Sequence, residues 1–201
     1  IKSISATKIV KDVKRNGDKA ILKYEKKFNK NNIIIPNPKQ ISKSIRSLDE
    51  KVKKAIDVAY NRIYKFHSFQ KFKNISYIDK LQNKLEYKYI PIESVAIYVP
   101  GSSASYPSSV LMNAIPALIA GVKRIVMVNP GQKGKQNSAV LYAAKKCGIK
   151  EIYSIGGPSA IAAVTYGTKR IKKVDKIVGP GNSHVAAAKK EVFGDVGIEG
   201  M

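Results

Sequence analysis

The pattern of apolar and polar positions changes near residue 90 of the 201-residue chain. After that point, short continuous apolar runs are each followed by a turn and then by a segment with helical spacing. Such runs are typical of strands buried on both faces, and a strand, a turn and a helix make the unit of a parallel sheet. Residues 91–201 are therefore expected to form a Rossmann-like βα domain. The runs predict strands at 94–99, 124–128, 151–155 and 176–178.

The first part of the chain follows a helical period. Residues 3–28 predict a helix interrupted by an Asn-Gly-Asp sequence, in which Asp18 is a candidate cap for a second segment. Apolar residues recur at three- and four-residue spacing over residues 38–66, which predicts one long helix, and residues 75–90 predict a β-hairpin. The expected fold is an α/β protein in which a Rossmann-like parallel sheet follows an N-terminal helical arm with a hairpin, residues 1–90.

Basic side chains strongly outnumber acidic ones: 37 Lys and Arg against 14 Asp and Glu give a formal net charge of +23. Such a charge allows binding to nucleic acid. The bases are nearly all Lys and lie scattered, without an RNA-recognition motif or a zinc-finger spacing, which favours a Lys-rich surface instead. No run is long and apolar enough to span a bilayer, and the single Cys147 cannot form an internal disulfide. The expected location is the cytoplasm.

Two Gly-containing turns, at residues 156–159 and 179–182, follow predicted strands and precede Ala-rich helical segments. Glycine lets the backbone approach a ligand closely, and the first turn of a helix presents unpaired N–H groups that suit a phosphate. Two such turns at the carboxyl edge of a sheet indicate a nucleotide-type ligand. Neither turn matches G-x-G-x-x-G and the chain holds no P-loop sequence, so a purely steric need for glycine is an equally good explanation.

Few side chains near these turns can carry chemistry. Tyr98 ends a predicted strand, where it is either a core aromatic or a contact for adenine or ribose. Asn182 is either a helix cap or a polar contact to the same ligand. His67 and His184 are distant in sequence and, with the lone cysteine, offer no metal-ligand spacing. Asp175 is expected at the amino end of its strand, away from the turns, with a structural role.

The turns and the segments around them resemble those of histidinol dehydrogenases, and the resemblance covers essentially the whole chain. It implies an incomplete Rossmann-like domain in a homodimeric enzyme that uses NAD and zinc. Such enzymes oxidise L-histidinol through the aldehyde to L-histidine, the last steps of histidine biosynthesis. The matching stretches are YVPGSSASYPSSVLMNAIPALIAGV (98–122), IYSIGGPSAIAAVTYGT (152–168) and VDKIVGPGNSHVAAAKKEVFGDVGIE (174–199), with GDKAILKY (17–24) and FHSFQ (66–70) in the arm.

The resemblance assigns three residues to the cofactor. Tyr98 and Asn182 stand where the family places a tyrosine and an asparagine that contact NAD, and Ser159 stands where the family usually has a glutamine. Serine is shorter and lacks the amide group. Further departures from the family pattern fall at Ser102, at Pro158 and at His184, where the family commonly has an aromatic residue. Each departure lies in a ligand loop, so an altered affinity for NAD is expected.

The resemblance also implies that the chain is truncated at its C-terminal end. In the family, the sequence continues beyond I-E-G-M into an A-G-P-S-E segment, followed by the zinc ligands and a Glu-His acid/base pair. No catalytic residue and no zinc ligand is therefore expected in this chain, which alone should be inactive. Two alternatives stay open: a relative in the same family that oxidises another alcohol, and a non-catalytic, basic nucleic-acid-binding protein.

Overall fold

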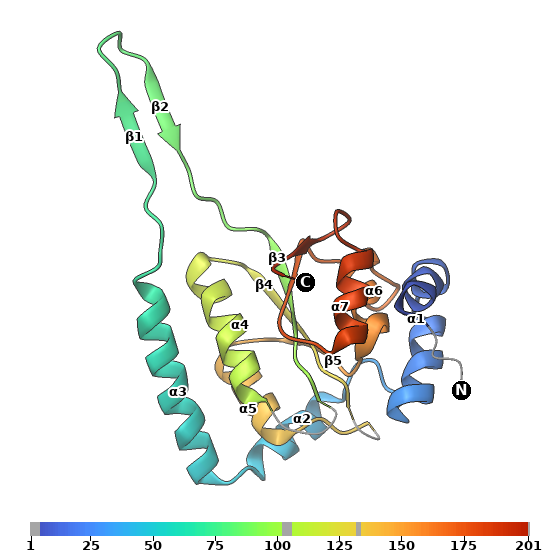
Figure 1. Ribbon diagram of the computed structural model, residues 1–201. Helices are drawn as coiled ribbons and strands as arrows, with labels where there is room; N and C mark the ends of the chain where they lie inside the picture. The colour runs from blue at the N-terminus through green and yellow to red at the C-terminus, as the bar shows by residue number, and fades with distance from the viewer. Residues whose placement is uncertain (1–4, 102–105, 132–133, 201) are drawn as a thin grey trace.

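A computed structural model describes residues 5–101, 106–131 and 134–200, which build an α/β fold around one parallel sheet (Figure 1). The sheet has the strand order β5-β4-β3-β6-β7, and all neighbouring strands run parallel. This confirms the expected Rossmann-like α/β fold, and β7 is an additional strand that the sequence pattern did not predict. The strands are β3 (Ser94–Tyr98), β4 (Arg124–Val128), β5 (Glu151–Tyr153), β6 (Lys176–Val178) and β7 (Gly197–Ile198).

The strand order reverses between β3 and β6. The strands β4 and β5 extend the sheet on one side of β3, and the chain then returns to place β6 and β7 on the other side. Val95 of β3 thus pairs with Ile125 on one side and with Lys176 on the other. Open α/β sheets bind ligands outside the carboxyl ends of the strands at such a reversal.

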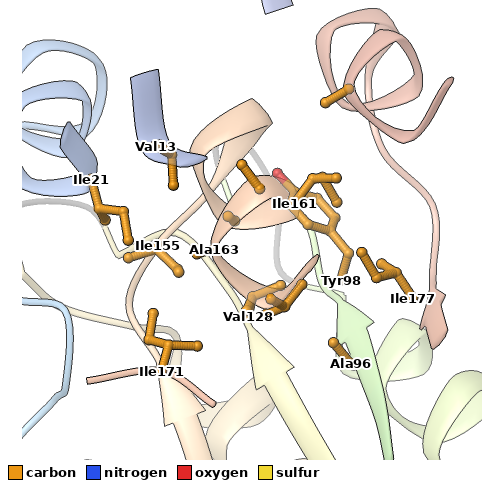
Figure 2. Packing of buried hydrophobic residues seen from close by; sticks show 14 of the residues in the cluster. Val13, Ile21, Ala96, Tyr98, Val128, Ile155, Ile161, Ala163, Ile171 and Ile177 are labelled. Atoms are coloured by element: carbon orange, nitrogen blue, oxygen red, sulfur yellow. The ribbon is translucent and has the colours of Figure 1, made fainter. Parts of the chain in front are cut away.

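Helices cover both faces of the sheet, and the central strand β3 is therefore buried along its whole length. Ala96 and Tyr98 belong to the core on one face, and Val95 and Ile97 to the core on the other, as the two-residue period of a strand requires. The first face, seen closely in Figure 2, carries α1 (Ala6–Asn29), α6 (Gly157–Tyr166) and α7 (Ser183–Glu191). The second carries α4 (Pro107–Ala120) and α5 (Ser138–Lys146), with α2 (Pro38–Arg46) and α3 (Glu50–Ser68) packed against them.

The prediction of one long helix over residues 38–66 is wrong, because α2 and α3 are separated at residues 47–49. The side chain of Asp49 accepts a hydrogen bond from the Lys51 N–H at 2.6 Å and so caps α3. The break lets α2 pack on α5 while α3 runs along α4. Periodicity alone does not detect it, since Leu48 and Val52 keep the helical spacing across the break.

Helix α1 bends where the sequence predicts an interruption. Gly17 has φ 51° and ψ −131°, outside the helical region, and the helix resumes after it. Such a left-handed φ is readily adopted by glycine. The predicted cap role of Asp18 is wrong, since its carboxylate lies 3.8 Å from Arg170 Nε and its other, buried oxygen has no hydrogen-bond partner among the described residues.

The predicted hairpin forms from β1 (Ile75–Ile78) and β2 (Lys84–Tyr87), paired antiparallel. It projects from the body of the molecule (Figure 1), and every residue of its two strands is exposed. The proposed boundary near residue 90 stays a prediction. Helices that precede this boundary share hydrophobic cores with the sheet region. Ile21 of α1, for example, belongs to the same buried cluster as the residues of α6. Among the described helices, none combines the length and the hydropathy needed to cross a bilayer.

Candidate functional site

Three segments meet at the carboxyl edge of the sheet, and they include or overlap Tyr98 and the two turns, 156–159 and 179–182, that the sequence singled out. They are the end of β3 at Tyr98, residues 154–157 before α6 (the α6 turn) and residues 179–182 before α7 (the α7 turn). The Gly157 N–H donates to the Tyr98 hydroxyl at 3.0 Å, and the α7 turn lies against the Tyr98 carbonyl. Tyr98 therefore joins both turns where the strand order reverses. Ser102, which follows β3 in the sequence, lies outside the described residues.

Tyr98 is a core side chain with a structural hydrogen bond. It is 5% exposed, and Figure 2 shows it reaching from β3 toward the helix that carries Ile161. Burial raises the pKa of its phenol above the usual value. The structure thus shows a buried aromatic whose hydroxyl orders the α6 turn, and its contact with NAD stays a prediction.

Ser159 lies beneath the same turn. It is 3% exposed, its hydroxyl donates to the Gly156 carbonyl at 2.8 Å, and the same hydroxyl lies 3.4 Å from Glu25 Oε1. The position for which the resemblance implies a glutamine is therefore filled here by a short side chain that forms its hydrogen bonds within the chain. Its predicted contact with NAD also stays a prediction.

Glu25 is a site residue that sequence reasoning missed. It is 1% exposed and accepts hydrogen bonds from the Gly156 N–H at 2.8 Å and from Asn29 Nδ2 at 2.7 Å. Burial raises the pKa of its carboxyl, while these hydrogen bonds act in the opposite direction. The missed signal is its place four residues after Ile21, on the apolar face of the first helix, where a carboxylate is rarely found without a partner.

The segment between α1 and α2 supports the start of the α6 turn. Asn31, which is 1% exposed, donates from Nδ2 to the Ser154 carbonyl at 2.7 Å and to the Ile33 carbonyl at 2.9 Å. The Ser154 N–H in turn donates to the Ile34 carbonyl at 2.7 Å. The segment after the first helix is therefore a buried polar support for the candidate site.

The ion pair between Lys189 and Glu199 stabilises the α7 turn. Lys189 is 5% exposed, and its Nζ donates to the Gly179 carbonyl at 2.7 Å and to Glu199 Oε1 at 3.0 Å. The same oxygen of Glu199 accepts from the Gly179 N–H at 2.8 Å. Both backbone groups of Gly179 are satisfied by this one pair. Sequence reasoning missed it, because one lysine among many gives no local signal.

Asn182 caps α7, since its Oδ1 accepts a hydrogen bond from the Val185 N–H at 3.1 Å. The cap alternative is thereby confirmed. The side chain is also exposed, and so is His184 in the first turn of α7. Asn182 is thus accessible to a ligand at the edge of the sheet, and its contact with NAD stays a prediction.

Packing within the chain explains two of the turn glycines without a ligand. A Cβ at Gly179, where φ is 108°, would overlap the Tyr98 carbonyl oxygen, and a Cβ at Gly156 would come within 2.6 Å of Pro130 Cβ. Gly157 differs, because its φ is 60° and a Cβ there would meet no atom within 4 Å. The left-handed φ of Gly157 accounts for glycine at that position, so packing or backbone conformation explains all three of these glycines.

The other candidate residues lie away from this edge. Asp175 accepts hydrogen bonds from the Ser94 hydroxyl at 2.7 Å and the Ser94 N–H at 2.8 Å, which lower its pKa and confirm its structural role. His67 Nδ1 lies 2.6 Å from Gln70 Oε1 in the last turn of α3, and burial raises the pKa of Cys147 to about 12. Within the described ranges, no group of three or more His, Cys, Asp or Glu side chains is placed to hold a metal ion.

Known proteins resemble this chain in both sequence and structure. The family model for histidinol dehydrogenase matches residues 2–201. The chain is 83% identical over its full length to the histidinol dehydrogenase of Pelagibacter ubique (strain HTCC1062), and 46% identical over 95% of its length to that of Acinetobacter baylyi (strain ATCC 33305 / BD413 / ADP1). A crystal structure of histidinol dehydrogenase from Elizabethkingia anophelis matches 98% of the chain with a TM-score of 0.92 and 37% identity.

The chain spans about half the length of these relatives: 47% and 46% of the two sequences and 48% of the crystallised chain. Over that span the match includes both turns and the strands that position them. Agreement in sequence and in fold over nearly every residue shows that the chain belongs to the histidinol dehydrogenase family.

Proposed function

We propose that the protein containing this chain oxidises L-histidinol through the aldehyde to L-histidine, with NAD as the oxidant, in histidine biosynthesis. The observation that carries the proposal is the 83% identity over all 201 residues to a histidinol dehydrogenase. The reversal of strand order between β3 and β6 supports a dinucleotide at this edge of the sheet, because open α/β sheets bind such ligands there.

In this proposal the described residues hold and orient the cofactor. Asn182, exposed at the start of α7, contacts NAD directly. Tyr98 and Ser159 are buried beneath the α6 turn, and their hydroxyls stabilise its conformation through hydrogen bonds to the backbone of Gly157 and Gly156. NAD would supply a hydride acceptor and zinc a Lewis acid for the alcohol oxygen. We place the zinc ligands and the acid/base pair outside this chain, in agreement with the family resemblance.

We further propose that the protein is a cytoplasmic homodimer. The hairpin supports an interface, because large apolar side chains of its two strands are open to solvent, including Ile75 and Tyr87, each 60% exposed. A two-stranded hairpin is marginally stable in water and gains from a packing surface. Light scattering on the full-length protein measures the oligomeric state.

Nucleic-acid binding is left out of the proposal, since the lysines are scattered along the chain.

The activity is tested with purified full-length protein, L-histidinol, NAD and zinc, by following the absorbance of NADH. Two hydride transfers predict two NADH for each histidine formed. The same assay with a panel of other amino alcohols distinguishes a histidinol dehydrogenase from a relative that oxidises another alcohol. The 201-residue chain on its own is the matched control and is expected to be inactive. NADH formation by that control would contradict our placement of the chemistry outside the chain.

A further inference from the structure

We propose that Glu25 is the anion that α6 binds at its N-terminus, and that the diphosphate of NAD is therefore held away from the α6 turn. The inference rests on the proposed use of NAD and deepens it, because it excludes one of the two turns as the phosphate site. The first turn of a helix carries unpaired N–H groups and a partial positive charge, which an anion commonly occupies. Here that anion comes from the chain itself.

The two backbone donors at the start of α6, the Gly156 and Gly157 N–H groups, already have partners within the chain. Gly156 is the N-cap residue of α6 and has no side chain to cap the helix. Its N–H donates to Glu25 Oε1 at 2.8 Å, and the Gly157 N–H donates to the Tyr98 hydroxyl at 3.0 Å. The Ser159 hydroxyl points to the Gly156 carbonyl at 2.8 Å. A phosphate bound to the Gly156 or Gly157 N–H would have to displace Glu25 or the Tyr98 hydroxyl.

Glu25 is firmly anchored in that position. Its second oxygen, Oε2, accepts from Asn29 Nδ2 at 2.7 Å, and only 1% of the residue is exposed. It is carried by α1, which packs on α6 over its length through the shared apolar core. The side chains that act on the carboxylate are neutral. They are those of Asn29, Asn31 and Ser159, together with the phenol of Tyr98 on β3. When ionised, this carboxylate repels a second anion brought to the same turn.

The test compares Glu25→Gln with the wild-type full-length protein at about pH 8, well above the usual range of a carboxyl group. The variant keeps the shape of the side chain and an acceptor for the Gly156 N–H, but removes the charge. We expect NAD and ADP-ribose to bind about three- to tenfold more tightly, because the repulsion of their phosphates is lost. Adenosine, which has no phosphate, should bind with unchanged affinity.

Glu93→Gln is the matched control, since Glu93 is exposed and directly precedes β3 at the opposite, amino edge of the sheet. It should leave the affinities for NAD and adenosine unchanged. If Glu25 has only a structural role, Glu25→Gln should change the affinities for adenosine and for NAD by the same factor. That result would overturn the inference.

A crystal structure of the wild-type protein with NAD tests the same point without any variant. We expect no diphosphate oxygen within hydrogen-bonding distance of the Gly156 N–H, with Glu25 still in place. A diphosphate on that N–H would refute the inference and leave the proposed activity intact. If the wild-type protein binds no NAD at all, the proposed function fails, and this inference fails with it.

Discussion

The ion pair behind the α7 turn can be removed with one substitution, Lys189→Met. Methionine keeps an unbranched apolar stem in the same space but has no ammonium group. The Gly179 carbonyl then loses a donor at 2.7 Å, and Glu199 loses its cation at 3.0 Å. The Gly179 N–H still donates to Glu199, so the turn keeps one of its two supports.

The expected cost follows from burial. A buried carbonyl left without a donor costs about 1–3 kcal/mol. The Glu199 side chain is 37% exposed, so water replaces much of the lost ion pair, and we assign that loss no more than about 1 kcal/mol. The free energy of unfolding should therefore fall by about 1–4 kcal/mol. Urea denaturation of the full-length protein measures it, and hydrogen exchange at residues 179–182 shows whether the loosening is local.

Lys190→Met is the matched control, because Lys190 is the next residue on α7 and is exposed. Its effect should stay within about 0.5 kcal/mol, as for most surface substitutions. Lys189→Met should also weaken binding of NAD, since Asn182 belongs to the turn that loosens. If the two variants lose equal stability and equal affinity, the ion pair does not support the turn and the reasoning is refuted.

Three further outcomes are expected. Gly179→Ala should abolish NAD binding and sharply lower thermal stability, because a Cβ there overlaps the Tyr98 carbonyl at a φ of 108°, whereas Gly148→Ala, at φ 70° with open space around it, should cost only about 1 kcal/mol. Tyr98→Phe leaves the Gly157 N–H without its acceptor and should lower the free energy of unfolding by about 1–2 kcal/mol, measured by denaturation, and an unchanged value would contradict that bond. Cys147 is buried, with its pKa raised to about 12, so a thiol reagent at pH 9 should label it slowly in the native protein and rapidly in urea, and equal rates would show that it is accessible.

The strands and helix ends of the sheet region could be predicted from the sequence because they depend on local properties of the chain. The run at residues 94–98 is apolar or small at every position, which requires burial on both faces, and the structure buries all five residues. Gly121 ends α4 with φ 88°, a conformation that glycine adopts readily, and Asn182 begins α7 as a cap. Such signals lie within a few residues of the feature that they predict.

Strand order, β7 and the break between α2 and α3 needed the tertiary structure. The strand β7 has two residues, Gly197 and Ile198, which is too short for any periodic pattern, and it is defined by pairing with β6. The break at residues 47–49 interrupts no apolar spacing, and it lets α2 pack on α5 while α3 packs mainly on α4 and also on α5. Contacts between elements decide such features, and a linear pattern does not record them.

The sequence by itself determined the family, the fold class and the place of the candidate site, because its motifs follow the strands that end at one edge of the sheet. Only the tertiary structure decided what those motifs contact. It brings Glu25 against Gly156, 131 residues away, and sets Lys189 and Glu199 around Gly179. The physical reason is that a buried charge needs partners, and the fold supplies those partners through packing between distant segments.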